Sequence, residues 1–148
     1  MDLLETEQRV VVRVDWKGYQ TLIELVGEQP RLRLTYDRGA LEIMTTSNEH
    51  ERKKSVIGRL LECLMLELGQ DFVCGGSQTF QRQDLDRGIE PDECYWIQHG
   101  QDIVEMVRYD PEFYPPPDLA VEVEVSRGLL NRIGIYGSMR VPEIWRWT

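Results

Sequence analysis

The segment from Pro117 to Ser126, with the sequence Pro-Asp-Leu-Ala-Val-Glu-Val-Glu-Val-Ser, is the part of this chain that most constrains its fold. Its valines and its strict alternation predict a β-strand, in which successive side chains point to opposite faces. Glu122 and Glu124 then share one face and lie about 7 Å apart, at a rise of roughly 3.3 Å per residue. Carboxylates this close repel each other unless a cation lies nearby. Such a face is either the solvated side of an edge strand or a metal-binding surface.

The composition bounds the classes of protein to which the chain can belong. Its 148 residues suffice for a single domain, residues 1–148, with a core of its own. The formal net charge of -9 argues against broad nonspecific binding of nucleic acid, yet it allows a local basic patch or carboxylates balanced by metal ions. No apolar run approaches the roughly 20 residues that cross a bilayer, so we expect no membrane association. Three widely separated cysteines and no signal-peptide pattern predict reduced thiols in a cytoplasmic protein.

Hydrophobic periodicity predicts an alternation of helices and strands. Asp15 is expected to cap a helix that Gly27 ends, and the turn 37–39 is expected to join two strands of a hairpin. On the first of these strands Arg31 and Arg33 alternate with apolar residues and, with Arg38, form a modest basic edge, which we expect to be solvated rather than phosphate-binding. Further strands, a helix over 129–138 and a final strand over 143–147 follow. This order predicts an α/β sandwich with a mixed sheet.

A long helix is predicted to begin at Ser47 or Asn48, with acidic residues in its first turn, and to end at Gly69. Its predicted buried stripe consists of Ile57, Leu60, Leu61, Leu64 and Leu68. Projecting this stripe backward through turns of about 3.6 residues puts three kinds of polar side chain at its N-terminal end: His50 on the centre line, Lys53 and Lys54 on either side, and Glu51 on the flank. Because burying such a cluster is costly, we expect this end of the helix to open into a cleft or a site.

Three acidic residues occur in an order that suits phosphodiester chemistry. Glu51 lies in the long helix, Asp92 follows Pro91 at the mouth of a strand, and Glu122 lies within the next strand. Asp92 in that position is either a turn residue or a metal ligand. Carboxylate oxygens are the ligands that Mg²⁺ and Mn²⁺ prefer, and such ions polarise a phosphoryl oxygen and acidify the attacking water.

The dipeptide Pro91-Asp92, followed by Glu122-x-Glu124, resembles the PD-(D/E)xK nuclease pattern. More specifically, the chain resembles the Uma2 family of restriction-endonuclease-like domains. The matching segments run in order through most of the chain: 36–44, 47–51, 88–94, 117–123 and 141–147. The resemblance implies a restriction-endonuclease-like mixed sheet flanked by helices. It also implies a DNA substrate, a homodimer and, since the chain stops at Thr148, a C-terminally short form.

The resemblance also implies a set of site residues. Asp92 and Glu122, with Glu124 as a possible third ligand, would hold Mg²⁺ or Mn²⁺, while Glu51 and His50 complete the pocket. The sequence departs from the family pattern because Glu124 occupies the place of the usual lysine. In some relatives the lysine lies in the following helix, where this chain has Arg132. Arginine keeps the charge but does not act as a base at neutral pH, so Lys54 or Arg132 is expected to supply only positive charge.

Two functions are consistent with these residues. The leading hypothesis is a metal-dependent DNA endonuclease that hydrolyses phosphodiester bonds with Asp92, Glu122, Glu124 and Glu51. The alternative is a nuclease fold that has lost catalysis and serves in nucleic-acid binding or protein assembly. A third interpretation makes the acids a structural network with Lys53, Lys54 and Arg132.

Overall fold

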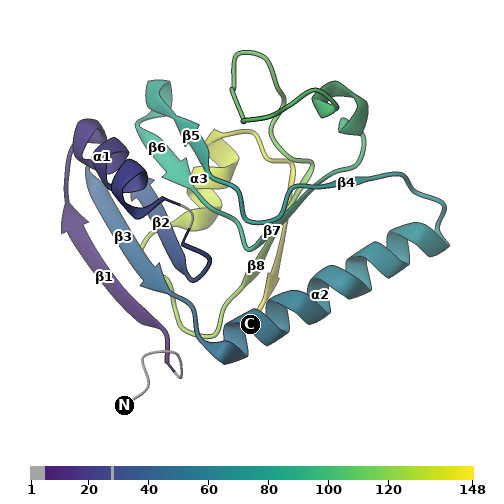
Figure 1. Cartoon of the computed structure of the whole chain (residues 1–148), viewed down its shortest axis with the longest axis horizontal. Coiled ribbons are helices and arrows are strands. Elements are labelled where there is room, and N and C mark those ends of the chain that lie inside the picture. The colour runs from purple at the N-terminus through teal and green to yellow at the C-terminus, as the bar shows by residue number, and fades with distance from the viewer. Residues whose placement is uncertain (1–5, 28) are drawn as a thin grey trace.

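The computed structural model describes residues 6–27 and 29–148. Its α-helices and β-strands, in chain order, are β1 (Gln8–Arg13), α1 (Trp16–Val26), β2 (Leu32–Asp37), β3 (Ala40–Thr45), α2 (Asn48–Glu67), β4 (Val73–Cys74), β5 (Phe80–Arg82), β6 (Arg87–Ile89), β7 (Glu93–Trp96), β8 (Leu119–Val123), α3 (Arg132–Ser138) and β9 (Glu143–Trp147). The predicted α/β class is confirmed, and the architecture is consistent with a restriction-endonuclease-like fold (Figure 1). The strands divide between two sheets: an antiparallel sheet in the order β1-β3-β2-β6-β5 and a mixed sheet in the order β4-β7-β8-β9.

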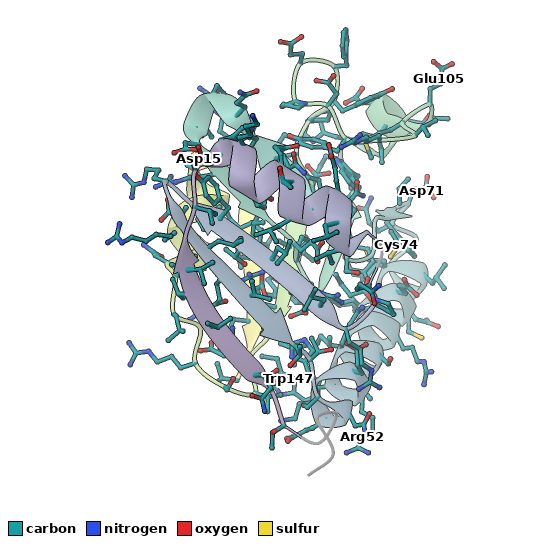
Figure 2. All side chains as sticks on the ribbon, turned by 60° about the vertical axis from the view of Figure 1, so that its left-hand side comes forward. Asp15, Arg52, Asp71, Cys74, Glu105 and Trp147 are labelled. Atoms are coloured by element: carbon teal, nitrogen blue, oxygen red, sulfur yellow. The ribbon has the colours of Figure 1, made fainter. Side chains whose placement is uncertain are left out.

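Helix α1 covers one face of the antiparallel sheet, and in Figure 2 it lies in front of the strands. The Asp15 side chain accepts a hydrogen bond from the Gly18 N–H at 2.8 Å, which caps the helix as predicted. Tyr19 stacks on Tyr36 of β2 with their ring centroids 4.7 Å apart. A Cβ on Gly88 of β6 would overlap the Tyr19 ring, so only glycine permits this close approach.

The opposite face of the antiparallel sheet is also buried, and this corrects one prediction. Arg33 and Thr35 of β2 are 3% and 1% exposed, although the basic edge was expected to be solvated. A solvated edge requires one face of the hairpin to be in contact with water. In the structure α1 covers the apolar face while α3 and the mixed sheet lie over the other. Of the three arginines, only Arg38 in the turn is largely exposed.

Helix α2 begins and ends close to the predicted residues, but its predicted buried stripe is wrong in part. Ser47 is the N-cap, and its hydroxyl accepts a hydrogen bond from the His50 N–H at 3.1 Å. The buried positions are His50, Gly58, Leu61 and Met65. The helix rests on the short strands of the mixed sheet along this single line, so the row Leu60, Leu64 and Leu68 faces outward at 61%, 48% and 71% exposure.

The predicted strand within 117–126 is confirmed as β8, and it is central to the mixed sheet. It pairs antiparallel with β7 and parallel with β9, and all five of its residues are buried. Helix α3 is shorter than predicted and starts at Arg132, capped by the Asn131 side chain, which accepts from the Gly134 N–H at 3.0 Å. Across residues 6–27 and 29–148, no helix has the length and apolar character that crossing a membrane requires.

Candidate carboxylate site

Asp92 and Glu122 meet because β7 and β8 are neighbouring strands. The Asp92 N–H donates to the Val121 carbonyl at 3.2 Å, and Asp92 Oδ2 accepts from the Val123 N–H at 2.8 Å. Both carboxylates line one pocket of about 380 Å³. The charged residues around this pocket are Arg9, Arg33, Glu90, Asp92, Glu122, Glu124, Arg127, Arg132 and Arg146. The wall therefore carries five arginines and four carboxylates, in a chain whose formal net charge is -9.

Arg132, the first residue of α3, is the principal partner of Glu122. Its Nε and Nη2 donate to Glu122 Oε1 at 3.1 and 2.6 Å, and the Tyr136 hydroxyl donates to the same oxygen. Burial raises the pKa of Glu122, and the charge of Arg132 opposes that rise. Burial would lower the pKa of Arg132, but the Glu122 carboxylate raises it. Arg132 also donates to Thr35 Oγ1 and, at 2.6 Å, to the Glu90 carbonyl, so a single guanidinium joins both sheets.

Asp92 belongs to a buried chain of ionisable groups that starts at the N-terminal segment. His50 Nε2 lies 2.7 Å from Asp92 Oδ1, and His50 Nδ1 lies 2.6 Å from Glu7 Oε1. Burial lowers the pKa of His50, but hydrogen bonds and charges from Asp92 and Glu7 outweigh it and raise the pKa to about 9. Burial likewise opposes, yet does not prevent, a lowered pKa for Asp92, which the His50 hydrogen bond and charge produce. At neutral pH the imidazolium therefore lies between two carboxylates.

Some of the predicted site residues share one pocket, and others lie elsewhere. Asp92, Glu122, Glu124 and Arg132 line the same pocket. Glu124 pairs with Arg146 of β9 at 3.3 Å, on the more exposed side of the pocket.

Two predicted residues of helix α2 have other partners. Glu51 accepts a hydrogen bond from Thr46 Oγ1 at 2.8 Å. Lys54 lies near Glu93 of β7. Burial raises the pKa of Glu93, and the charge of Lys54 opposes that rise.

Six charged residues of the site were missed: Glu7, Arg9, Arg33, Glu90, Arg127 and Arg146. Arg9 donates to Glu42 Oε1 at 3.0 Å and to Ser126 Oγ at 3.1 Å, so β1 is tied to the segment that follows β8. Glu90 adjoins the predicted Pro91-Asp92 motif, and this proximity is a signal that sequence reasoning had available. Glu7, Arg9 and Arg33 come from the N-terminal segment and the hairpin, and only the packing of the two sheets brings them to the site.

The carboxylate oxygens of Asp92 and Glu122 are ligands that suit a hard cation. In the structure, however, the positively charged side chains of His50 and Arg132 bind these oxygens. Each Asp92 oxygen has one donor and retains a second lone-pair direction, while Glu122 Oε1 is taken by Arg132 and Tyr136. Within residues 6–27 and 29–148, no three His, Cys, Asp or Glu side chains gather as an ion would require. Asp92 and Glu122 carry the carboxylate oxygens that could serve Mg²⁺ or Mn²⁺, and in this structure His50 and Arg132 are bound to them.

The fold and the site together define a class: an α/β, restriction-endonuclease-like domain with paired carboxylates on neighbouring strands. The sequence model of the Uma2 family, described as "Putative restriction endonuclease", matches residues 16–148, and the chain belongs to this family. Membership indicates a nuclease-like function. Searches of curated proteins and of solved structures returned no match. Glu7 and Arg9 precede the matched region, although both contact the site.

Proposed function

We propose that this protein is a metal-dependent DNA endonuclease of the PD-(D/E)xK type, which hydrolyses phosphodiester bonds in the pocket formed by Asp92 and Glu122. The observation that carries the proposal is the burial of these two carboxylates side by side in one pocket lined by arginines. Burying two acids costs stability unless they are compensated, so such pairs occur preferentially at functional sites. The arginine lining suits a polyanionic substrate, since guanidinium groups bind phosphate oxygens in pairs.

Each residue of the pocket has a part in this proposal. Asp92 and Glu122 would hold Mg²⁺ or Mn²⁺, with Glu124 as the outermost carboxylate. The bound ion supplies a polarised phosphoryl oxygen and an acidified water. His50 fixes the orientation of the Asp92 carboxylate through its 2.7 Å contact. Arg132 moves from Glu122 to the phosphate and stabilises the charge that develops there.

Nicking of supercoiled plasmid DNA tests the proposal. Wild-type protein with Mg²⁺ or Mn²⁺ is expected to nick the plasmid, and EDTA is expected to abolish nicking. Asp92→Asn and Glu122→Gln each remove a ligand charge with little change in shape, and we expect at least a roughly hundredfold loss of rate. Glu105→Gln is the matched control, because Glu105 (labelled in Figure 2) is exposed, lies in a loop and does not line the pocket. Nicking that survives Asp92→Asn would contradict the proposal.

A specific observation favours a second candidate, a nuclease fold that binds nucleic acid without cutting it or serves in protein assembly. Side chains of the protein itself balance the charges of the two carboxylates, since His50 pairs with Asp92 and Arg132 pairs with Glu122. Titration calorimetry with Mn²⁺ separates the candidates. The endonuclease proposal expects binding that Asp92→Asn abolishes. The second candidate expects no Mn²⁺ binding, with DNA retention that Asp92→Asn leaves unchanged.

We further propose that the protein forms a homodimer through helix α2. The outward row of Leu60, Leu64 and Leu68 lies at four-residue spacing and continues from Val56, so it forms an apolar stripe along one side of the helix. A second copy presents the same stripe, and an antiparallel pairing would cover both. Light scattering of Leu60→Glu/Leu64→Glu is expected to give a monomer where wild type gives a dimer. A wild-type monomer at micromolar concentration would contradict this.

The three cysteines support a cytoplasmic location, which we include in the proposal. Cys63, Cys74 and Cys94 form no disulfide with one another, and the first two are exposed. Free exposed thiols are typical of reducing compartments.

A further inference from the structure

Arg33 is a buried arginine whose position in the pocket the carboxylate chemistry does not explain. In the antiparallel sheet, Met44 of β3 is the register partner of both Arg9 of β1 and Arg33 of β2. These three residues therefore lie in a row on one face of the sheet, and all three line the pocket. The row extends the pocket away from Glu122 toward the hairpin.

One edge of the Arg33 guanidinium has no hydrogen-bond partner in the part of the chain that the structure describes. Its Nη1 donates to the Pro30 carbonyl at 2.8 Å, whereas Nε and Nη2 meet no acceptor, and the side chain is only 4% exposed. The nearest carboxylate oxygen, Glu90 Oε2, lies 3.8 Å from Nε, which is too far for a hydrogen bond. Leaving charged donors unsatisfied in a buried position is costly, so a further partner is expected there.

Arg132 shows what this edge of a guanidinium binds. Its Nε and Nη2, the same pair of nitrogens, hold the Glu122 carboxylate. This fork matches two oxygens of a carboxylate or a phosphate. Three other arginines of the pocket already have acidic partners, since Arg9 pairs with Glu42, Arg132 with Glu122 and Arg146 with Glu124.

We propose that Arg33 binds a phosphate group of a nucleic-acid strand, at a subsite beside the bond that Asp92 and Glu122 act on. The identity of the strand as nucleic acid rests on the proposed function, whereas the binding of a phosphate group does not. Glu90 is the built-in competitor for this subsite. Thr79 Oγ1 holds Glu90 Oε1 at 2.7 Å, and the carboxylate turns away from Arg33 when phosphate binds. The pocket volume of about 380 Å³ falls in the range of small-ligand sites.

Binding of inorganic phosphate, measured by calorimetry at millimolar concentration, tests the subsite directly. We expect Arg33→Gln to weaken binding by roughly tenfold or more, since both charge-assisted bonds are lost. Glu90→Gln removes the competing charge and is expected to strengthen binding several-fold. Arg38→Gln in the exposed turn of the same hairpin is the matched control, with unchanged affinity expected. Arg33→Lys keeps the positive charge but loses the paired donors of the guanidinium, so it is also expected to bind phosphate more weakly than wild type. If Arg33→Gln fails to fold, the weaker binding of Arg33→Lys tests the proposal.

Two further arms separate the subsite from the nuclease proposal and identify the source of the phosphate. Phosphate binding is measured in metal-free buffer and does not require cleavage, so an absence of nicking alongside Arg33-dependent phosphate binding overturns only the nuclease proposal. Short oligonucleotides with a 5′-phosphate or a 5′-hydroxyl then reveal the source. A preference for the phosphorylated strand that Arg33→Gln erases indicates a terminal phosphate, whereas equal weakening of both indicates a backbone phosphate. The proposal is overturned if wild type binds no phosphate, or if neither Arg33 variant weakens binding.

Discussion

At the scale of single residues, the pairing of charges decides what the pocket can do. Glu122 is almost wholly buried, and its partner Arg132 reaches Thr35 and the Glu90 carbonyl as well. Truncating one member of a buried pair leaves the other charge uncompensated, which costs more than the pair itself contributes. Glu124 and Arg146 also form an ion pair, but their side chains are 25% and 41% exposed, so solvent screens their interaction. The two pairs therefore offer a built-in comparison.

Arg132→Met is expected to lower the free energy of unfolding by about 3 to 5 kcal/mol, because Glu122 stays buried without its cation. Adding Glu122→Gln to this variant is expected to restore at least about 1 kcal/mol, which makes the two substitutions strongly non-additive. Arg146→Met is the control, with an expected cost below about 1 kcal/mol. Urea unfolding of wild type, Arg132→Met, Glu122→Gln, the double variant and Arg146→Met measures these differences. Additive losses from Arg132→Met and Glu122→Gln would show that no buried ion pair exists.

At the scale of elements, the sequence predicts what local chemistry determines and fails where a neighbouring layer decides. Asp15, Ser47 and the turn 37–39 define the ends of α1, α2 and the hairpin through caps and turn residues, and these predictions are confirmed. The stripe of α2 depends on how much sheet lies beneath it. The narrow mixed sheet covers Leu61 but leaves Leu60 exposed, and no periodicity distinguishes these neighbours. Gly88 is similar, since only the approach of α1 makes it obligatory.

Gly88→Ala is expected to destabilise the fold by about 1 to 3 kcal/mol, the usual cost of overpacking a core. The added methyl group would overlap Tyr19, whose ring is fully buried against Tyr36 and has no room to shift. Tyr19→Phe removes the hydroxyl nearest to the new methyl group, so it is expected to recover part of the loss. Tyr19→Phe alone should cost little, because its buried hydroxyl has no hydrogen-bond partner among the described residues. Thermal unfolding checks the series, and an unchanged midpoint for Gly88→Ala would contradict the packing argument.

At the scale of the whole molecule, the site exists because two sheets meet. The order Asp92, Glu122, Arg132 was readable from the sequence, because a strand pair and the helix that follows bring these three together locally. Arg33 and Glu7 were not readable. Their positions follow from the antiparallel sheet closing over the mixed one, and each would look like an ordinary surface charge in its own segment. Sequence periodicity predicts which face of a single helix or strand is buried. It does not predict which residues of two different layers line a pocket between them.

The chain Glu7–His50–Asp92 spans this junction, and it makes the stability of the whole fold depend on pH in metal-free buffer. The folded pKa of His50, about 9, lies above its ordinary value of 6.5, so the folded state binds a proton more tightly than the unfolded state. The stabilisation is therefore fully present below pH 6.5, and it is lost as the pH rises through about 9. The loss amounts to at most about 3 kcal/mol. Urea unfolding between pH 6.5 and 9.5 measures this decline, and His50→Gln is expected to flatten it. A wild-type midpoint that stays constant across that window would show that the imidazole is neutral in the folded protein.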